Sequence, residues 1–179
     1  DLSHLTNSEL YIKMENLQRC KAFKFRGALS KISTLPKGST CVCASAGNHS
    51  QGCSLSAQIC GMKMIVYMPE TAPQSKVDAT RGYGAEVRQV GQSFDESNAQ
   101  SLKDCEANPD WTFVPPFDCN EVIAGQGTIG LEICEQEKNV DYVVVAVGGG
   151  GLAAGVGIAI KALSPKTKVI AVNASIRPA

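Results

Sequence analysis

The sequence has no excess of charge of either sign. Its 179 residues include 17 lysine and arginine residues and 17 aspartate and glutamate residues, so the formal net charge at pH 7 is zero. Nucleic acids and anionic membrane surfaces attract basic proteins, so this balance supports neither partner. The apolar fraction of 44% suits a packed globular core. Small molecules therefore remain the expected binding partners.

Histidine is scarce, and no C-x-x-C motif occurs. With only His4 and His49, a tetrahedral zinc site would be poorly supplied with ligands, so we predict no metal site. The eight cysteines are scattered through apolar patterns, and nothing at the N-terminus resembles a signal peptide. We interpret them as reduced thiols of a cytoplasmic protein. Cys41 and Cys43 alternate along one predicted strand and are expected to share a buried face.

The chain also lacks an uninterrupted apolar run that fits a membrane-spanning helix. Residues 142–160 carry no charge, and their length could cross a bilayer. However, four consecutive glycines stand inside this segment and would interrupt a helix at its centre. A strand, a tight loop and then a helix fit the segment better, so we predict no membrane partner.

What the chain does contain is a regular alternation of strand and helix patterns. Predicted strands cover residues 10–13, 41–44, 64–68, 85–90, 112–114, 142–147 and 168–172, and predicted helices cover residues 26–32, 50–60, 73–81, 94–107, 121–136 and 152–163. Alternation of this kind is typical of parallel sheets covered by helices. We therefore predict an α/β fold.

Residues 15–28, E-N-L-Q-R-C-K-A-F-K-F-R-G-A, set a lysine between two phenylalanines. Desolvation of Lys24 by Phe23 and Phe25 would lower its pKa, and a neutral amine can attack an aldehyde to form a Schiff base. Judged on this segment alone, a surface lysine beside two core phenylalanines is the simpler interpretation. The rest of the chain bears on the choice.

Two further blocks stand where a predicted strand ends and a helix begins. In the run at residues 148–151, G-G-G-G, the amide groups can converge on a phosphate with a helix N-terminus behind them. A tight turn that binds nothing is the alternative. The block S-A-G-N-H-S-Q-G at residues 45–52 has the same setting, and ligands collect at the carboxyl ends of parallel strands.

Taken in order, these three blocks resemble the fold-type II pyridoxal-phosphate enzymes, most closely the threonine/serine dehydratase (threonine ammonia-lyase) branch and its serine racemase relatives. The resemblance covers nearly the whole chain. It extends to M-P-E-T-A-P-Q-S-K-V at residues 68–77, G-Y-G-A-E-V at 82–87 and V-I-A-G-Q-G-T-I-G-L-E-I at 122–133.

The resemblance implies a tryptophan-synthase-β-like fold with two parallel-sheet α/β domains, the smaller inserted in the larger. Residues 39–117 would form the inserted domain, and residues 1–38 and 118–179 the large cofactor domain. Family members continue past Ala179, and this chain opens on Asp1, so we expect sequence to be missing at both ends. The partner of the pyridine nitrogen and any cation site would lie beyond Ala179.

The resemblance also implies pyridoxal 5′-phosphate as the cofactor and assigns residues to it. Lys24 would hold the aldehyde as a Schiff base and move the substrate's α-proton, with Phe23 near the ring and Asn48 hydrogen-bonded to the phenolic oxygen. The phosphate would lie on Gly148, Gly149, Gly150, Gly151 and Leu152. An amino-acid substrate would be bound by Ser45, Ala46, Gly47, Asn48 and His49, of which the histidine is expected to orient the loop.

Ala46 bears on the reaction. Racemases of the family carry a serine at this position, whose hydroxyl acts on the opposite face of the substrate. An alanine favours β-elimination, which needs a base on one face only. The resemblance therefore implies an ammonia-lyase that removes water and then ammonia from L-threonine or L-serine to give a 2-oxo acid. Serine racemase-like activity and a non-catalytic ligand-binding or remnant protein of the same fold stay open, and a homo-oligomer is compatible with the sequence.

A different class of protein is suggested by Gly149, Gly151 and Ala154, which fit the dinucleotide-binding pattern G-x-G-x-x-A. An NAD-dependent oxidoreductase would need an acidic residue at the end of the following strand to bind the ribose. Asn173 occupies that neighbourhood instead. The oxidoreductase is therefore a weaker alternative.

Overall fold

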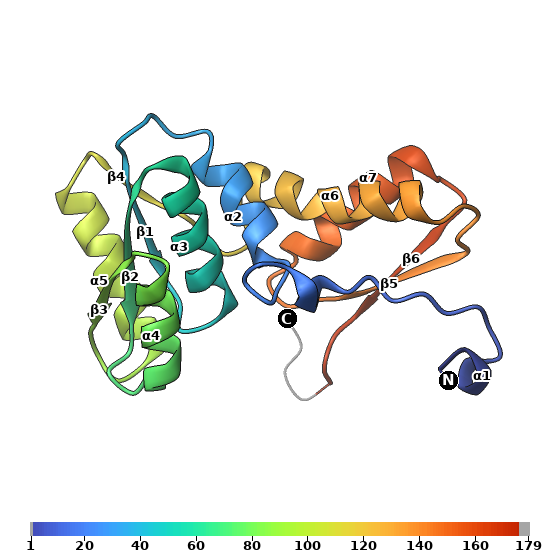
Figure 1. Ribbon diagram of the computed structural model, residues 1–179, viewed down its shortest axis with the longest axis horizontal. Coiled ribbons are helices and arrows are strands. Elements are labelled where there is room, and N and C mark those ends of the chain that lie inside the picture. Colours follow the sequence, from blue (N-terminus) through green and yellow to red (C-terminus); the bar gives the residue numbers. More distant parts are fainter. Residues whose placement is uncertain (1, 176–179) are drawn as a thin grey trace.

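The computed structural model describes residues 2–175, which fold around two parallel sheets (Figure 1). The first sheet has the strand order β3-β2-β1-β4, and its strands are β1 (Thr40–Ala44), β2 (Lys63–Met68), β3 (Glu86–Gln89) and β4 (Trp111–Phe113). The second sheet pairs β5 (Tyr142–Ala146) with β6 (Lys168–Val172). Every strand pair is parallel. The predicted α/β class is confirmed.

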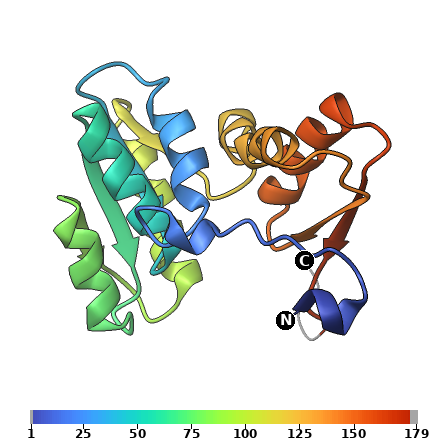
Figure 2. The ribbon, with the colours of Figure 1, turned by 45° about the vertical axis from the view of Figure 1, so that its right-hand side comes forward.

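Helices cover both faces of the first sheet and one face of the second. They are α1 (Leu2–Thr6), α2 (Lys24–Ile32), α3 (Asn48–Cys60), α4 (Gln74–Gly82), α5 (Phe94–Ala107), α6 (Asn120–Gln136) and α7 (Gly151–Leu163), and a short 3₁₀ turn covers Glu15–Leu17. Helices α3 and α4 lie on one face of the first sheet and α5 on the other (Figure 1). Figure 2 shows α2 between α3 and α6, so this helix joins the two halves of the molecule.

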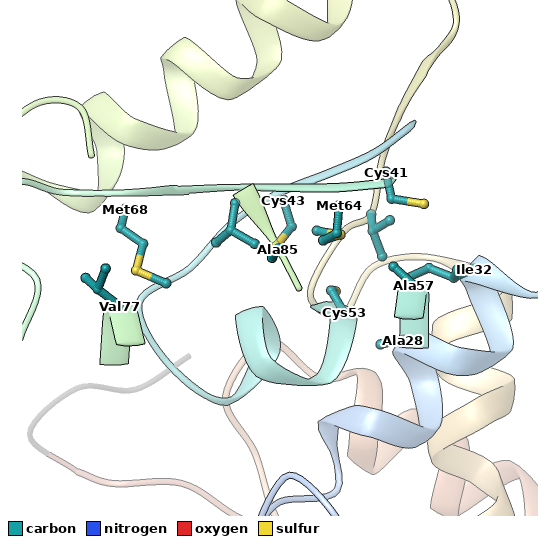
Figure 3. Packing of buried hydrophobic residues seen from close by; sticks show 12 residues of the cluster. Ala28, Ile32, Cys41, Cys43, Cys53, Ala57, Met64, Met68, Val77 and Ala85 are labelled. Carbon is teal, nitrogen blue, oxygen red and sulfur yellow. The ribbon is translucent and has the colours of Figure 1, made fainter. Parts of the chain in front are cut away.

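The core of the first sheet follows the two-residue period of a strand. Cys41 and Cys43 point to the α3 side and are fully buried there, as predicted (Figure 3). Val42 and Ala44 belong to a separate cluster on the α5 face. The sheet is therefore apolar on both faces, which is typical of a parallel sheet covered by helices.

The second sheet is covered on one face only in the described residues. Val143 and Val145 are buried against α6 and α7, whereas Tyr142 and Val144 are mainly exposed. Helices α6 and α7 approach each other closely at Gly155, where an added Cβ would lie 2.3 Å from the carbonyl oxygen of Ile123. This close packing holds α7, and the glycine loop before it, against α6.

The predicted helices and strands from residue 26 onward all form, with ends that differ by two residues or fewer. The strand predicted at residues 10–13 is wrong. Leu10, Tyr11 and Ile12 lie in an irregular, exposed segment, because no strand in the described residues runs beside them to accept their backbone hydrogen bonds. Among residues 2–175, no helix combines the length and apolarity needed to cross a membrane.

The first sheet lies within residues 39–117 and the second within residues 118–179. The division into an inserted and a large domain itself stays a prediction. Asp1 and residues 176–179, at the ends of the predicted large domain, lie outside the described residues.

Candidate functional site

Lys24 is the first residue of α2, and its side chain turns toward the segment that follows β4. Its Nζ donates a 2.7 Å hydrogen bond to the backbone carbonyl of Pro116 and lies 5.4 Å from the centre of the Phe23 ring. Burial lowers the pKa of the Lys24 amine, although the nearby Cys53 thiol opposes this shift. Phe25, the other predicted neighbour, lines a separate hollow with Arg26 and Leu29. Phe23 therefore supplies the aromatic contact.

The glycine run forms the connection between β5 and α7. Gly150 has a φ of +83°, which a side-chain-bearing residue rarely adopts, and α7 begins at the next residue. The first N–H groups of a helix have no partner within it, and they carry the positive end of the helix dipole. An added Cβ on Gly148 would meet no atom within 4 Å, so the loop is open on that side. The backbone can therefore receive an anion here.

Lys24 and the glycine run share one cavity of about 210 Å³. Its lining also includes Phe23 and Leu152, which were both predicted as site residues. The full lining is Phe23, Lys24, Pro116, Phe117, Gln126, Ala146, Val147, Gly148, Gly149, Gly150, Gly151 and Leu152. A half-buried amine and a glycine loop that can receive an anion lie on one cavity, which suits a ligand that carries both an aldehyde and a phosphate. The residues present therefore fit the predicted cofactor.

The predicted substrate loop, residues 45–49, borders Lys24 but does not line this cavity. It runs from the end of β1 into α3, with the Ser45 N–H donating to Tyr67 and the Ser45 hydroxyl accepting from the N–H of Gly47. Helix α3 passes so close to α2 that an added Cβ on Gly52 would lie 3.1 Å from the carbonyl carbon of Lys24. The loop is thus held next to the lysine, at the carboxyl edge of the first sheet.

His49 is buried in this region rather than exposed to a ligand. Its Nε2 lies 3.0 Å from the backbone oxygen of Val114. Desolvation lowers the pKa of His49 to about 4, a shift that its hydrogen bond to Val114 opposes and the charge of Lys24 reinforces. The ring is therefore neutral near pH 7, which suits the predicted orienting role better than proton transfer.

Five residues of the cavity lining were not among the predicted site residues: Pro116, Phe117, Gln126, Ala146 and Val147. Gln126 is buried, and its Oε1 accepts a hydrogen bond from the backbone N–H of Gly27. Pro116 and Phe117 lie at the end of the predicted inserted domain, residues 39–117. The order of the predicted strands could have indicated Pro116 and Phe117. They follow β4, which pairs directly with β1, so their loop lies at the same edge of the sheet as residues 45–49.

Arg26 holds the N-terminal segment to α6. Its guanidinium pairs with Glu15 at 2.9 Å and with Glu132 at 2.5 Å. These hydrogen bonds lower the pKa of Glu132 to about 2. The network fixes the segment that leads into the lysine block.

Known proteins resemble this chain in sequence and in fold. The L-threonine ammonia-lyase of Thermotoga maritima is 48% identical over 180 residues, which cover 99% of this chain and 45% of that protein. The processed form of threonine deaminase isoform 2 from Solanum lycopersicum superposes with a TM-score of 0.94 at 42% identity, covering 96% of this chain and 48% of that one. Serine racemase from Dictyostelium discoideum superposes with a TM-score of 0.90 at 38% identity, covering 97% of this chain and 57% of that one.

The chain thus spans about half the length of these relatives. The pyridoxal-phosphate dependent enzyme family matches all of residues 1–179. This chain therefore belongs to the pyridoxal-phosphate dependent enzyme family, which confirms the family and the cofactor predicted from its motifs.

Proposed function

We propose that the protein of which this chain is part is an ammonia-lyase that converts L-threonine, and L-serine as a second substrate, to a 2-oxo acid. The observation that carries the proposal is the single cavity shared by the Lys24 amine and the glycine run. Support for threonine comes from relatives named threonine ammonia-lyase and threonine deaminase, at 48% and 42% identity. Serine racemase, at 38%, is the main competing relative.

The cofactor would be held by residues from both halves of the molecule. When bound, pyridoxal 5′-phosphate supplies an electron sink that stabilises negative charge at the substrate's α-carbon. Lys24 would bind its aldehyde, and the amides of Gly148–Gly151 together with Leu152 would bind its phosphate at the start of α7. Phe23 would pack beside the ring. Asn48, at the first position of α3, would donate to the phenolic oxygen.

Lys24 is suited to move the proton of the reaction. Burial favours its neutral amine, and the neutral amine is the form that accepts a proton from the α-carbon. The carbonyl of Pro116 accepts a hydrogen bond from Nζ and so holds the amine against the cavity wall. A base positioned in this way works on one face of the substrate.

The loop at residues 45–49 would bind the substrate carboxylate. The loop ends where α3 begins, so free amide groups and the positive end of the helix dipole face an anion there. Ala46 in this loop packs against the core on the α3 side of β1 and carries no hydroxyl. Position 46 therefore offers no acid or base for the opposite face, which supports elimination over racemisation.

We further propose the inserted domain at residues 39–117 and the large domain at residues 1–38 and 118–179. In support, each sheet falls wholly within one of these parts. We also infer a cytoplasmic location, because all eight cysteines are free thiols. An amino acid is the proposed binding partner.

The proposal is tested on the full-length protein loaded with pyridoxal 5′-phosphate. We expect 2-oxo acid release from L-threonine and L-serine without D-serine formation, and borohydride reduction should attach the cofactor to Lys24. Lys24→Ala should abolish both the label and turnover, whereas Lys21→Ala, an exposed lysine three positions earlier, should leave both. Attachment of the cofactor to another lysine would overturn the assignment of Lys24. Cofactor binding without turnover favours the non-catalytic alternative, D-serine formation favours a racemase, and NAD binding favours the oxidoreductase.

A further inference from the structure

Cys43, His49 and Cys53 form a compact buried cluster between β1 and α3. The Sγ atom of Cys53 lies 3.6 Å from Nδ1 and 3.5 Å from Nε2 of His49. One sulfur or nitrogen atom from each of the three residues lies within 4.8 Å of the other two. Both cysteines are 0% exposed, and His49 is 5% exposed. Figure 3 shows Cys43 on the strand and Cys53 on the helix below it.

The sequence places these residues together through two different periodicities. The two-residue period of β1 directs Cys43 toward α3, and the four-residue separation of His49 and Cys53 puts both on one face of the helix. The sequence predicts no metal site here, because this donor set has neither a C-x-x-C motif nor a second histidine. It is assembled across a strand and a helix.

His49 is already oriented as metal-bound histidines are. The Val114 carbonyl can only accept, so the proton of the ring lies on Nε2 and Nδ1 keeps its lone pair. A histidine that binds a metal usually donates its other ring N–H to a backbone carbonyl or a carboxylate in this way. Nδ1 is therefore available to a cation.

We propose that Cys43, His49 and Cys53 form a binding site for one soft divalent cation, such as Zn²⁺ or Cd²⁺. With Zn–S bonds of about 2.3 Å and Zn–N bonds of about 2.0 Å in tetrahedral geometry, sulfur and nitrogen ligands lie about 3.6 Å apart. The 3.6 Å between Sγ of Cys53 and Nδ1 of His49 matches this value.

The chemistry of the donors explains why a cation fits an apolar core here. On binding, each thiol releases its proton to solvent, and the two thiolates balance the charge of the ion, while the imidazole binds as a neutral ligand. The loaded site is neutral overall, so no counter-ion has to be buried. Thiolate and imidazole donors select soft ions over magnesium or calcium. A bound ion would tie the first turn of α3, which begins at Asn48, to β1.

The test uses full-length protein without cofactor and without oxygen, titrated with Cd²⁺ alone. To remove other thiols, the titration is done in a background in which the half-buried cysteines are changed to serine: Cys60, Cys105, Cys119 and Cys134. We expect one thiolate-to-cadmium charge-transfer absorption band that saturates at one ion per chain. Cys43→Ala and Cys53→Ala should each weaken cadmium binding at least tenfold.

Cys41→Ala is the matched control. Cys41 lies two residues before Cys43 on the same strand, is equally buried in the same core, and is outside the cluster. This variant should bind Cd²⁺ as the background protein does. As a second measurement, Cd²⁺ should raise the melting temperature of the background and of Cys41→Ala but not of Cys53→Val, which keeps the volume of the core. No band in folded protein, or a band that survives the loss of Cys43 and Cys53, overturns the proposal.

Discussion

The side-chain amine of Lys24 is hydrogen-bonded to the backbone carbonyl of Pro116 over 2.7 Å. The two residues come from different parts of the chain: one begins α2, and the other follows β4 in the segment that leads to α6. The carbonyl accepts a hydrogen bond from the amine whether or not the amine carries a charge. The contact therefore fixes the direction of the side chain, while burial determines its charge.

The first prediction concerns the reactivity of Lys24. Because burial lowers its pKa, the neutral amine should appear at lower pH in the folded protein than in the unfolded protein. Competitive labelling with trinitrobenzenesulfonate, followed by mass spectrometry of the peptide, measures this at a series of pH values. The labelling curve of Lys24 should shift to lower pH on folding. Identical curves in native protein and in urea would show that the amine is not desolvated.

The second prediction concerns the acid stability that depends on His49. The pKa of His49 is about 4 in the folded protein, against 6.5 for a histidine exposed to water. Between these two values the unfolded chain therefore binds a proton that the folded chain does not bind. The contribution of His49 to the free energy of unfolding is therefore fully present above pH 6.5 and is lost as the pH falls toward about 4. A difference of this size corresponds to about 3 kcal/mol.

The matched variant is His49→Gln, whose side-chain amide can still donate to the carbonyl of Val114. Urea unfolding of both proteins between pH 4 and pH 7 measures the difference. The wild-type free energy of unfolding should fall more steeply toward low pH than that of the variant. Parallel curves would mean that His49 is protonated in the folded protein or titrates normally.

Much of this fold could be predicted because the periodicity was unambiguous. Cys41 and Cys43, two residues apart, share one face of β1. Every strand and helix predicted from residue 26 onward is present. The strand prediction around Leu10 was wrong although its apolar residues have the local pattern of a strand. A strand also needs a neighbouring strand to pair with, and the local sequence does not show whether one is present.

The candidate site was predictable in part for the same physical reason. The glycine run at a strand-to-helix junction indicated an anion site by its residue types, whereas Lys24 was assigned through the resemblance of the three blocks to a known family. Phe117 and Gln126 line the cavity only because α6 and the loop after β4 are brought beside the lysine. Contacts of that kind depend on tertiary packing, so the local sequence alone does not predict them.

The third prediction compares two glycines of the glycine run, residues 148–151. A Cβ on Gly151 would lie 2.7 Å from the backbone oxygen of Phe117, whereas a Cβ on Gly148 would meet nothing within 4 Å. Gly151→Ala should therefore lower the free energy of unfolding by about 1–3 kcal/mol and weaken cofactor binding. Gly148→Ala should change the stability of cofactor-free protein by less than about 0.5 kcal/mol. Urea unfolding without cofactor measures both; equal effects would contradict the close contact with Phe117.

The fourth prediction separates packing from helix propensity within α7. A Cβ on Gly155 would lie 2.3 Å from the carbonyl oxygen of Ile123 and 2.6 Å from the nitrogen of Gly127, both backbone atoms of α6. Gly155→Ala must push the two helices apart, so it should destabilise the protein by about 1–3 kcal/mol or more.

Gly157, two residues later in the same helix, has nothing within 4 Å of an added Cβ. Gly157→Ala should stabilise the protein by up to about 1 kcal/mol, because alanine favours a helix interior over glycine. Thermal and urea unfolding of the two variants should therefore shift in opposite directions. Since α7 also carries the glycine run at its start, Gly155→Ala should weaken cofactor binding, and Gly157→Ala should not. Stabilisation by both substitutions would show that α6 and α7 are less closely packed than their backbone contacts require.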